Sequence, residues 1–215
     1  MNALDLRCYL VTSGAGRRTV EVAAEAAAEG AGVVQVRAKE ATARELLGLV
    51  VAVAEAVRAA NPVTRVLVDD RADIAFAARL RGAPVHGVHL GQDDLPVADA
   101  RALLGPEAII GLTTGTLDLV RAAEAVRDQV DYLGAGPFRR TPTKDSGRPP
   151  LGVEGYVALV AASSLPIVAI GDVTPADSAA LAGTGVAGVA LVRAVMEAPD
   201  PAAVVREVIT GFAEP

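Results

Sequence analysis

The chain has 215 residues, of which 20 are basic and 26 acidic, so its formal net charge is −6. This balance excludes proteins that bind nucleic acid through a broad basic surface, because such surfaces need excess cations to neutralise phosphates. Charges and glycines interrupt every apolar run, and the apolar part of the N-terminus is short. We therefore expect a cytoplasmic protein without a signal peptide, a spanning helix or a membrane partner.

Short apolar runs alternate with alanine-rich stretches along the whole chain. Ala, Glu and Leu recur at helical spacing in the stretches between the runs, as over Thr19–Glu29 and Ala41–Ala59. Near-continuous apolar strands separated by helices are typical of a buried parallel sheet. The predicted strands are Cys8–Val11, Val33–Val36, Val66–Val68, Gly87–Leu90, Ile109–Leu112, Tyr132–Ala135, Ile167–Ile170 and Gly188–Val192.

Eight strand–helix units predict a single-domain (β/α)8 TIM barrel over residues 1–215. The competing fold is an open, doubly wound sheet, which would normally have five or six units and needs no polar residue at every strand end. In a barrel the ends of all strands meet at one rim, so we expect the active site at their C-terminal ends. The residues that follow the strands are Thr12, Arg37, Asp69, Gly91, Thr113, Gly136, Gly171 and Arg193.

Two cations and an amide alternate in the run QVRAK, which includes Gln35, Arg37 and Lys39. Period-two spacing puts the three side chains on one face of an extended segment. Arginine binds phosphate oxygens through a planar fork, and lysine binds them as a compact charge. The run therefore favours a diphosphate site over a solvated strand end, because a central parallel strand offers little solvent to charged groups.

Paired aspartates follow the next two strands. Asp69 and Asp70 come after the third predicted strand, and Asp93 and Asp94 come after the fourth. Carboxylates from neighbouring strand ends can share Mg²⁺, whose other ligands are phosphate oxygens and water. The alternative is that Asp93 or Asp94 caps the helix entered at Pro96. With cations on the adjacent strand, we favour a metal–diphosphate site.

Three further features lie at predicted strand ends. His89 has no partners at zinc-site spacing, so we expect it to point into the barrel and make a structural hydrogen bond. The segment Gly136–Gly152 is long and rich in Pro, Gly and cations, as functional loops often are. Gly171 and Arg193 follow the last two strands, where barrels of this type commonly bind a phosphate.

These motifs, in this order, resemble the thiamine phosphate synthase family over nearly the whole chain. The resemblance implies a transferase that condenses 4-amino-5-hydroxymethyl-2-methylpyrimidine diphosphate with 4-methyl-5-(2-hydroxyethyl)thiazole phosphate, giving thiamine phosphate and diphosphate. It also implies Mg²⁺ as cofactor and small phosphorylated molecules as partners. The blocks that carry it are YLVT at Tyr9–Thr12, QVRAK at Gln35–Lys39, VDDRADIA at Val68–Ala75, VHLGQDDLP at Val88–Pro96, IIGLTT at Ile109–Thr114, DYLGAGPFRRTPTK at Asp131–Lys144, PLG at Pro150–Gly152 and AIGDVTP at Ala169–Pro175.

The resemblance also implies a role for each matching residue. Arg37, Lys39 and Lys144 would act on the leaving diphosphate, with Gln35 in the same run, and Asp70 and Asp94 would bind the metal. The expected substrate contacts are Asp69 and Thr113 for the pyrimidine, Thr141 and Thr143 for the thiazole phosphate, and Gly171, Asp172, Val192 and Arg193 for its phosphate end.

Four of these residues depart from the family pattern. Thr113 replaces a serine, and Asp69 replaces an asparagine, which adds a carboxylate beside the metal pair. Asp172 replaces a glycine, and its carboxylate would repel a phosphate unless it is paired. Arg193 replaces a small serine, and we expect its charge to offset that of Asp172.

Two other functions fit the same barrel. A thiazole tautomerase-like isomerase would use a histidine after the fifth strand, where this chain has Thr113-Thr114-Gly115. A catalytically impaired, phosphate-ligand-binding barrel is the second alternative, suggested by Asp69 and Asp172. The sequence makes no prediction of the oligomeric state.

Overall fold

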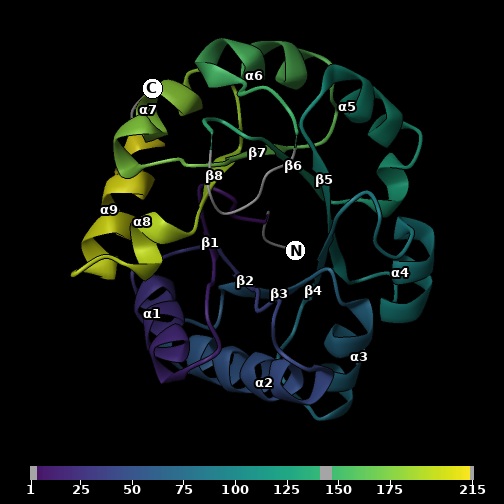
Figure 1. Ribbon diagram of the computed structural model, residues 1–215, viewed down its shortest axis with the longest axis vertical. Helices are drawn as coiled ribbons and strands as arrows, with labels where there is room; N and C mark the ends of the chain where they lie inside the picture. The colour runs from purple at the N-terminus through teal and green to yellow at the C-terminus, as the bar shows by residue number, and fades with distance from the viewer. Residues whose placement is uncertain (1–3, 141–146, 214–215) are drawn as a thin grey trace.

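Eight parallel strands close into a barrel, each hydrogen-bonded to the next and β8 to β1 (Figure 1). The computed structural model describes residues 4–140 and 147–213. The predicted (β/α)8 fold is confirmed, and the open-sheet alternative is wrong because both sheet edges pair with each other. The strands are β1 Cys8–Val11, β2 Val33–Val36, β3 Arg65–Asp69, β4 Gly87–Leu90, β5 Ile109–Thr114, β6 Tyr132–Ala135, β7 Ile167–Ile170 and β8 Gly188–Leu191.

The helices form a ring outside the strands (Figure 1). The longest, α2, begins with a capping box in which Thr42 and Glu45 satisfy each other's backbone N–H groups. The helices are α1 Arg17–Ala28, α2 Ala43–Ala60, α3 Ala72–Leu80, α4 Val97–Leu104, α5 Leu117–Glu124, α6 Gly152–Ala161, α7 Ser178–Ala182, α8 Arg193–Met196 and α9 Pro201–Gly211, with short 3-10 turns η1 Arg127–Gln129 and η2 Pro175–Asp177. Among the described residues, none of the helices has the length and apolarity needed to cross a bilayer.

Strand side chains alternate between two hydrophobic cores, as the pleat of a strand requires. The larger core fills the space between the barrel and its helices and consists mainly of Val, Leu, Ile and Ala. A smaller core lies inside the barrel and includes Tyr9, Val33, Leu67, Tyr132 and Val168. The side chains of this smaller core fill much of the barrel interior.

Two strands extend further than the apolar pattern predicts. β3 continues to Asp69, which pairs with His89, and β5 continues to Thr113 and Thr114, with Thr113 paired to Gly134. The hydrogen bonds between strands use only backbone groups. A strand can therefore continue through a polar residue when that residue's side chain faces a polar cavity. Asp69 and Thr113 are therefore held by the sheet itself.

The barrel is closely packed at Gly188, the first residue of β8. A Cβ added there would lie 1.6 Å from the Leu6 carbonyl oxygen, a backbone atom that cannot rotate away. We predict that Gly188→Ala lowers the free energy of unfolding by about 2 kcal/mol or more, measured by urea denaturation.

The matched control for that substitution is Gly48→Ala in α2, where a Cβ meets nothing within 4 Å. Alanine is the better helix former, so this variant should be as stable as the wild type or gain about 0.5–1 kcal/mol. Equal stability of both variants would contradict the packing explanation.

Candidate active site

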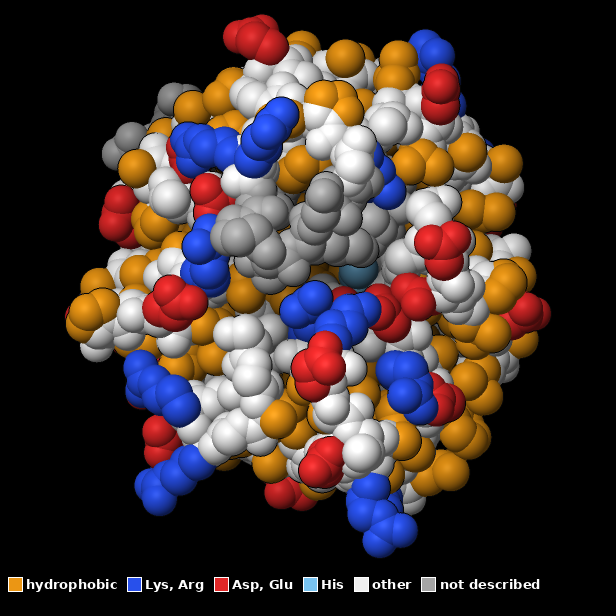
Figure 2. All heavy atoms as spheres, in the orientation of Figure 1, with side chains coloured by type: hydrophobic (Ala, Val, Ile, Leu, Met, Phe, Trp, Pro, Cys, Tyr) orange, Lys and Arg blue, Asp and Glu red, His pale blue; other side chains and the backbone are white. Residues whose placement is uncertain are grey.

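A cavity of about 400 Å³ opens at the C-terminal ends of the strands. Its lower wall is formed by barrel side chains such as Tyr9 and Tyr132, and its rim by polar residues that follow the strands. Figure 2 shows basic and acidic side chains side by side on this face, over the ends of β2, β3 and β4. The cavity therefore joins a partly apolar floor to a charged mouth, which suits a ligand with a ring and a phosphate group.

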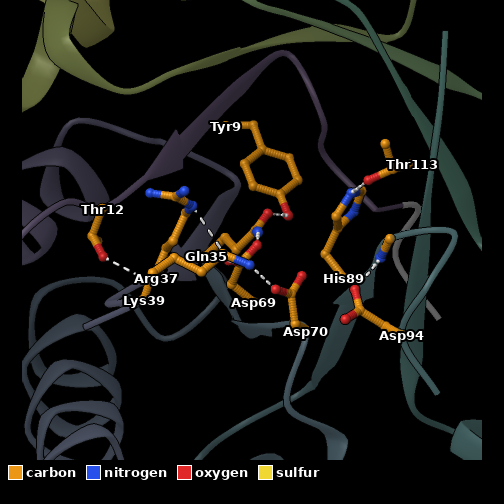
Figure 3. A network of polar contacts seen from close by, with 11 residues as sticks. Tyr9, Thr12, Gln35, Arg37, Lys39, Asp69, Asp70, His89, Asp94 and Thr113 are labelled. Carbon is orange, nitrogen blue, oxygen red and sulfur yellow. Dashed lines mark hydrogen bonds and ion pairs between the residues drawn. The ribbon is translucent and has the colours of Figure 1, made fainter. Parts of the chain in front are cut away.

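Cations after β2 pair with carboxylates at the end of β3 at this mouth (Figure 3). Arg37 Nε and Lys39 Nζ each lie 3.4 Å from Asp69 Oδ2, and Lys39 also contacts Asp70. The backbone helps to hold the group, because Thr12 Oγ1 accepts from the Arg37 N–H at 3.0 Å. Asp70 has a φ of 60°, a left-handed conformation that is uncommon outside glycine. Such strain is typical of functional sites.

Asp94 stands next to this cluster but does not line the cavity itself. Its Oδ2 accepts from the backbone N–H of Gly91 at 2.6 Å, and α4 has no side-chain cap. The alternative in which Asp93 or Asp94 caps this helix is therefore wrong. In Figure 3 the Asp94 side chain extends toward the side of the mouth where Asp70 lies.

The donor set suits Mg²⁺ better than a metal held by protein alone. Within residues 4–140 and 147–213, no three or more His, Cys, Asp or Glu side chains are grouped to hold a metal. Magnesium needs only one or two carboxylates, because substrate phosphate oxygens and water complete its octahedron. Asp70 and Asp94 could supply those carboxylates.

Hydrogen bonds connect the floor of the cavity from Asp69 to Thr113. Gln35 Nε2 donates to Asp69, and Gln35 Oε1 accepts from the Tyr9 hydroxyl at 2.7 Å. The Tyr9 and Tyr132 hydroxyls lie 2.7 Å apart, and Tyr132 is 2.9 Å from His89 Nδ1. His89 Nε2 lies 2.9 Å from Thr113 Oγ1. His89 therefore makes the structural hydrogen bonds that the sequence predicts.

Burial keeps both tyrosines in this network neutral. Removal from water raises the pKa of Tyr9 well above its usual range, and the nearby Tyr132 raises it further. Burial likewise raises the pKa of Tyr132. Space for its ring comes from Gly111, where a Cβ would lie 2.2 Å from Tyr132 Cζ and 2.4 Å from His89 Nδ1. A larger residue at 111 would break the network.

The opposite wall of the cavity is formed by the ends of β7 and β8. Arg193 donates to the Asp172 carboxylate, as the sequence predicts for a charge that offsets Asp172. Asp172 has a φ of 59°, the conformation that favours the glycine it replaces in the family pattern. Gly171 permits close approach of the loop after β6, since a Cβ there would lie 2.7 Å from Pro137 Cα.

Most of the predicted site residues lie together around one cavity. Thr141, Thr143 and Lys144 fall outside the described residues. Asp94 lies beside the cavity. The predicted residues that line it are Gln35, Arg37, Lys39, Asp69, Asp70, Thr113, Gly171, Asp172, Val192 and Arg193.

The cavity lining also includes residues that the sequence does not predict for the site, among them Tyr9, Tyr132 and Arg148. Tyr9 and Tyr132 sit in apolar runs, and their spacing indicates only that they are buried. A buried tyrosine hydroxyl usually needs a hydrogen-bond partner, so two tyrosines on predicted inner strands indicate polar contacts inside the barrel. Arg148 Nη1 donates to the Thr114 carbonyl oxygen at 2.5 Å, which brings the end of the Gly136–Gly152 segment to the mouth.

This chain is similar to known proteins over nearly its whole length. Residues 8–195 match the family described as thiamine monophosphate synthase. A thiamine-phosphate synthase from Corynebacterium efficiens is 64% identical over 98% of this chain and 96% of its own. One from Moorella thermoacetica is 42% identical over 96% of each chain.

Solved structures also resemble the barrel. A thiamine phosphate pyrophosphorylase from Pyrococcus furiosus superposes with a TM-score of 0.82 at 31% identity, covering 98% of this chain and 96% of that one. An orotidine 5'-phosphate decarboxylase from Pyrococcus horikoshii has a TM-score of 0.67 at 14% identity, covering 96% and 100%. The second likeness is one of fold alone.

Proposed function

The chain belongs to the thiamine monophosphate synthase family, and we propose that it joins 4-amino-5-hydroxymethyl-2-methylpyrimidine diphosphate to 4-methyl-5-(2-hydroxyethyl)thiazole phosphate. It is an enzyme of the transferase class. The bond between the pyrimidine methylene carbon and the diphosphate oxygen breaks, and the diphosphate leaves with the electron pair. The thiazole nitrogen then forms a new bond to that carbon, giving thiamine phosphate. The observation that carries this proposal is the shared mouth of cations and carboxylates at the ends of β2 and β3.

Arg37 and Lys39 hold the diphosphate in this proposal. Both lie at the mouth, and both pair with the Asp69 carboxylate. When a diphosphate binds, its oxygens replace the carboxylate oxygens as partners of these two cations. Their charges stabilise the negative charge that grows as the diphosphate leaves, which is the main task when little covalent chemistry falls to the protein. We assign Lys144 to the same leaving group, on the family resemblance.

Asp70 and Asp94 hold Mg²⁺ in this proposal. When bound, the ion neutralises charge on the diphosphate oxygens. Lys39 contacts Asp70 and keeps this carboxylate close to the cations that bind the same leaving group. The chain thus supplies carboxylates for the ion and cations for the diphosphate at one mouth.

The two ring systems occupy different parts of the cavity. We assign the pyrimidine to the floor, where Gln35, Thr113 and Asp69 offer hydrogen-bonding groups. We assign the thiazole phosphate to the opposite wall, at Gly171, Asp172, Val192 and Arg193, with Thr141 and Thr143 as further contacts. In this arrangement the thiazole nitrogen approaches the methylene carbon from the side opposite the diphosphate. No observation in the described site favours the isomerase alternative.

A coupled assay tests this function. We predict diphosphate release only when both substrates and Mg²⁺ are present, and its loss when EDTA removes the metal. Lys144→Ala should lower turnover by about 100-fold, because a charge that stabilises the leaving group is lost. Arg58→Ala, on the exposed last turn of α2, is the matched control and should keep wild-type turnover.

Two results of this assay would contradict the proposal. Binding of both substrates without diphosphate release would favour the catalytically impaired, ligand-binding barrel. Unchanged turnover in Lys144→Ala would remove the role assigned to that lysine.

A second prediction concerns the ion pair between Asp172 and Arg193. Arg193→Ser leaves the Asp172 carboxylate beside the thiazole phosphate without this cation, so we predict about tenfold weaker binding of that substrate. Combining it with Asp172→Gly removes the repulsion and should restore the affinity to within about threefold of the wild type. Calorimetry with the thiazole phosphate measures both effects, and unchanged affinity in Arg193→Ser would refute the role of the pair.

A further inference from the structure

The hydrogen bonds on the cavity floor form one continuous chain through six strands. It runs from Asp69 on β3 through Gln35 on β2, Tyr9 on β1, Tyr132 on β6 and His89 on β4. It ends at Thr113 Oγ1 on β5, which lines the cavity. Figure 3 shows Gln35, Tyr9, His89 and Thr113 on the inner face of the barrel. Because each bond shares a group with the next, their directions are coupled.

Asp69 sets the direction at one end. Its carboxylate pairs with Arg37 and Lys39 and can only accept hydrogen bonds. Gln35 must therefore turn its NH₂ group toward Asp69, which leaves Oε1 facing Tyr9. An amide oxygen only accepts, so the single proton of the Tyr9 hydroxyl is donated to Gln35.

The donor and acceptor in each remaining hydrogen bond follow from this assignment. Tyr9 has no second proton, so in the 2.7 Å bond between the two tyrosines Tyr132 is the donor. The Tyr132 oxygen must then accept from His89 Nδ1 at 2.9 Å. A neutral imidazole protonated on Nδ1 has a bare Nε2, which accepts from the Thr113 hydroxyl. Burial raises the pKa of both tyrosines, in agreement with hydroxyls that keep their protons.

The only hydroxyl proton of Thr113 is therefore used within the protein, and its oxygen offers lone pairs to the cavity. We propose that this one-way chain makes Thr113 a hydrogen-bond acceptor and selects a pyrimidine with an exocyclic amino group over one with an oxo group. An amino group donates to Thr113, whereas an oxo group would set two acceptors against each other. Tyr9 and Tyr132 act as positioning residues, and this inference rests on the proposed function for the identity of the ring.

The first test measures proton positions in the ligand-free protein by ¹⁵N NMR at pH 8, where an ordinary imidazole is neutral. The chain has two histidines, and His86 serves as an internal reference. Its Nδ1 accepts from the Val66 N–H at 3.0 Å, so its proton is on Nε2. Burial lowers the pKa of His86 to about 4, so this ring is also neutral. We expect opposite tautomers for the two rings, and a His89 proton on Nε2 would overturn the proposal.

The second test measures selectivity in binding, which needs no turnover. The probes are the aminopyrimidine diphosphate and its 4-oxo analogue, each titrated calorimetrically with Mg²⁺ present. The wild type should bind the amino compound at least about 100-fold more tightly. Both probes carry the same diphosphate, so the ratio of their dissociation constants cancels effects at the charged mouth. A wild-type ratio near one would overturn the proposal.

Tyr132→Phe interrupts the series of hydrogen bonds in its middle. Without the hydroxyl, the His89 proton is no longer fixed on Nδ1, so we expect a mixture of tautomers and a selectivity ratio about tenfold lower. The matched control is Tyr156→Phe, a fully buried tyrosine whose hydroxyl donates to the Ala135 carbonyl oxygen outside the chain. Tyr156→Phe should keep the wild-type ratio of dissociation constants. An equal fall of this ratio in both variants would mean that the effect comes from altered packing.

Asp69→Asn provides a second variant, which removes the fixed acceptor together with the charge that pairs with Arg37 and Lys39; the ratio of the two dissociation constants cancels the effect of that charge on the shared diphosphate. An asparagine can present either its oxygen or its NH₂ group to Gln35, so the direction of the chain is no longer imposed. The ratio should fall here too, and an unchanged ratio would contradict the role of Asp69. If the wild type shows the expected tautomers and selectivity but releases no diphosphate, the proposed function fails while this inference stands.

Discussion

Closure of the barrel is the constraint on which the rest of the site depends. β8 pairs with β1 through Cys8–Val189, Tyr9–Ala190 and Leu10–Leu191, so all eight strands point the same way around one axis. Side chains at the ends of strands far apart in the sequence must then face each other across a single cavity. An open sheet of the same strands would place the β2 and β7 ends at a distance from each other.

Asp69 connects the two halves of the cavity. Through its ion pairs with Arg37 and Lys39 it belongs to the charged mouth, and through Gln35 it belongs to the hydrogen-bonded floor. A neutral asparagine at this position would pair less strongly with the cations and would not fix the amide of Gln35. The replacement of asparagine by aspartate therefore changes both the charge and the hydrogen-bond direction of the site.

The opposite wall shows a compensated change. Asp172 occupies a left-handed backbone position where glycine is favoured, and it adds a negative charge next to the proposed phosphate site. Arg193 pairs with it across the ends of β7 and β8. These two departures are understandable only as a pair, because each removes the difficulty that the other would create.

The sequence by itself determined the (β/α)8 fold, because apolar strands that alternate with helices have few other ways to bury both faces. It also determined most of the residues at the mouth, since polar residues at strand ends such as Arg37, Asp70 and Arg193 stand out from an apolar background. Only the tertiary structure decided that Tyr9, Tyr132 and His89 connect Asp69 to Thr113. These residues lie on separate strands, and buried tyrosines look the same in a sequence whether they pack or relay a hydrogen bond. The direction of that chain depends on which atoms meet inside the barrel, and three-dimensional packing alone sets those contacts.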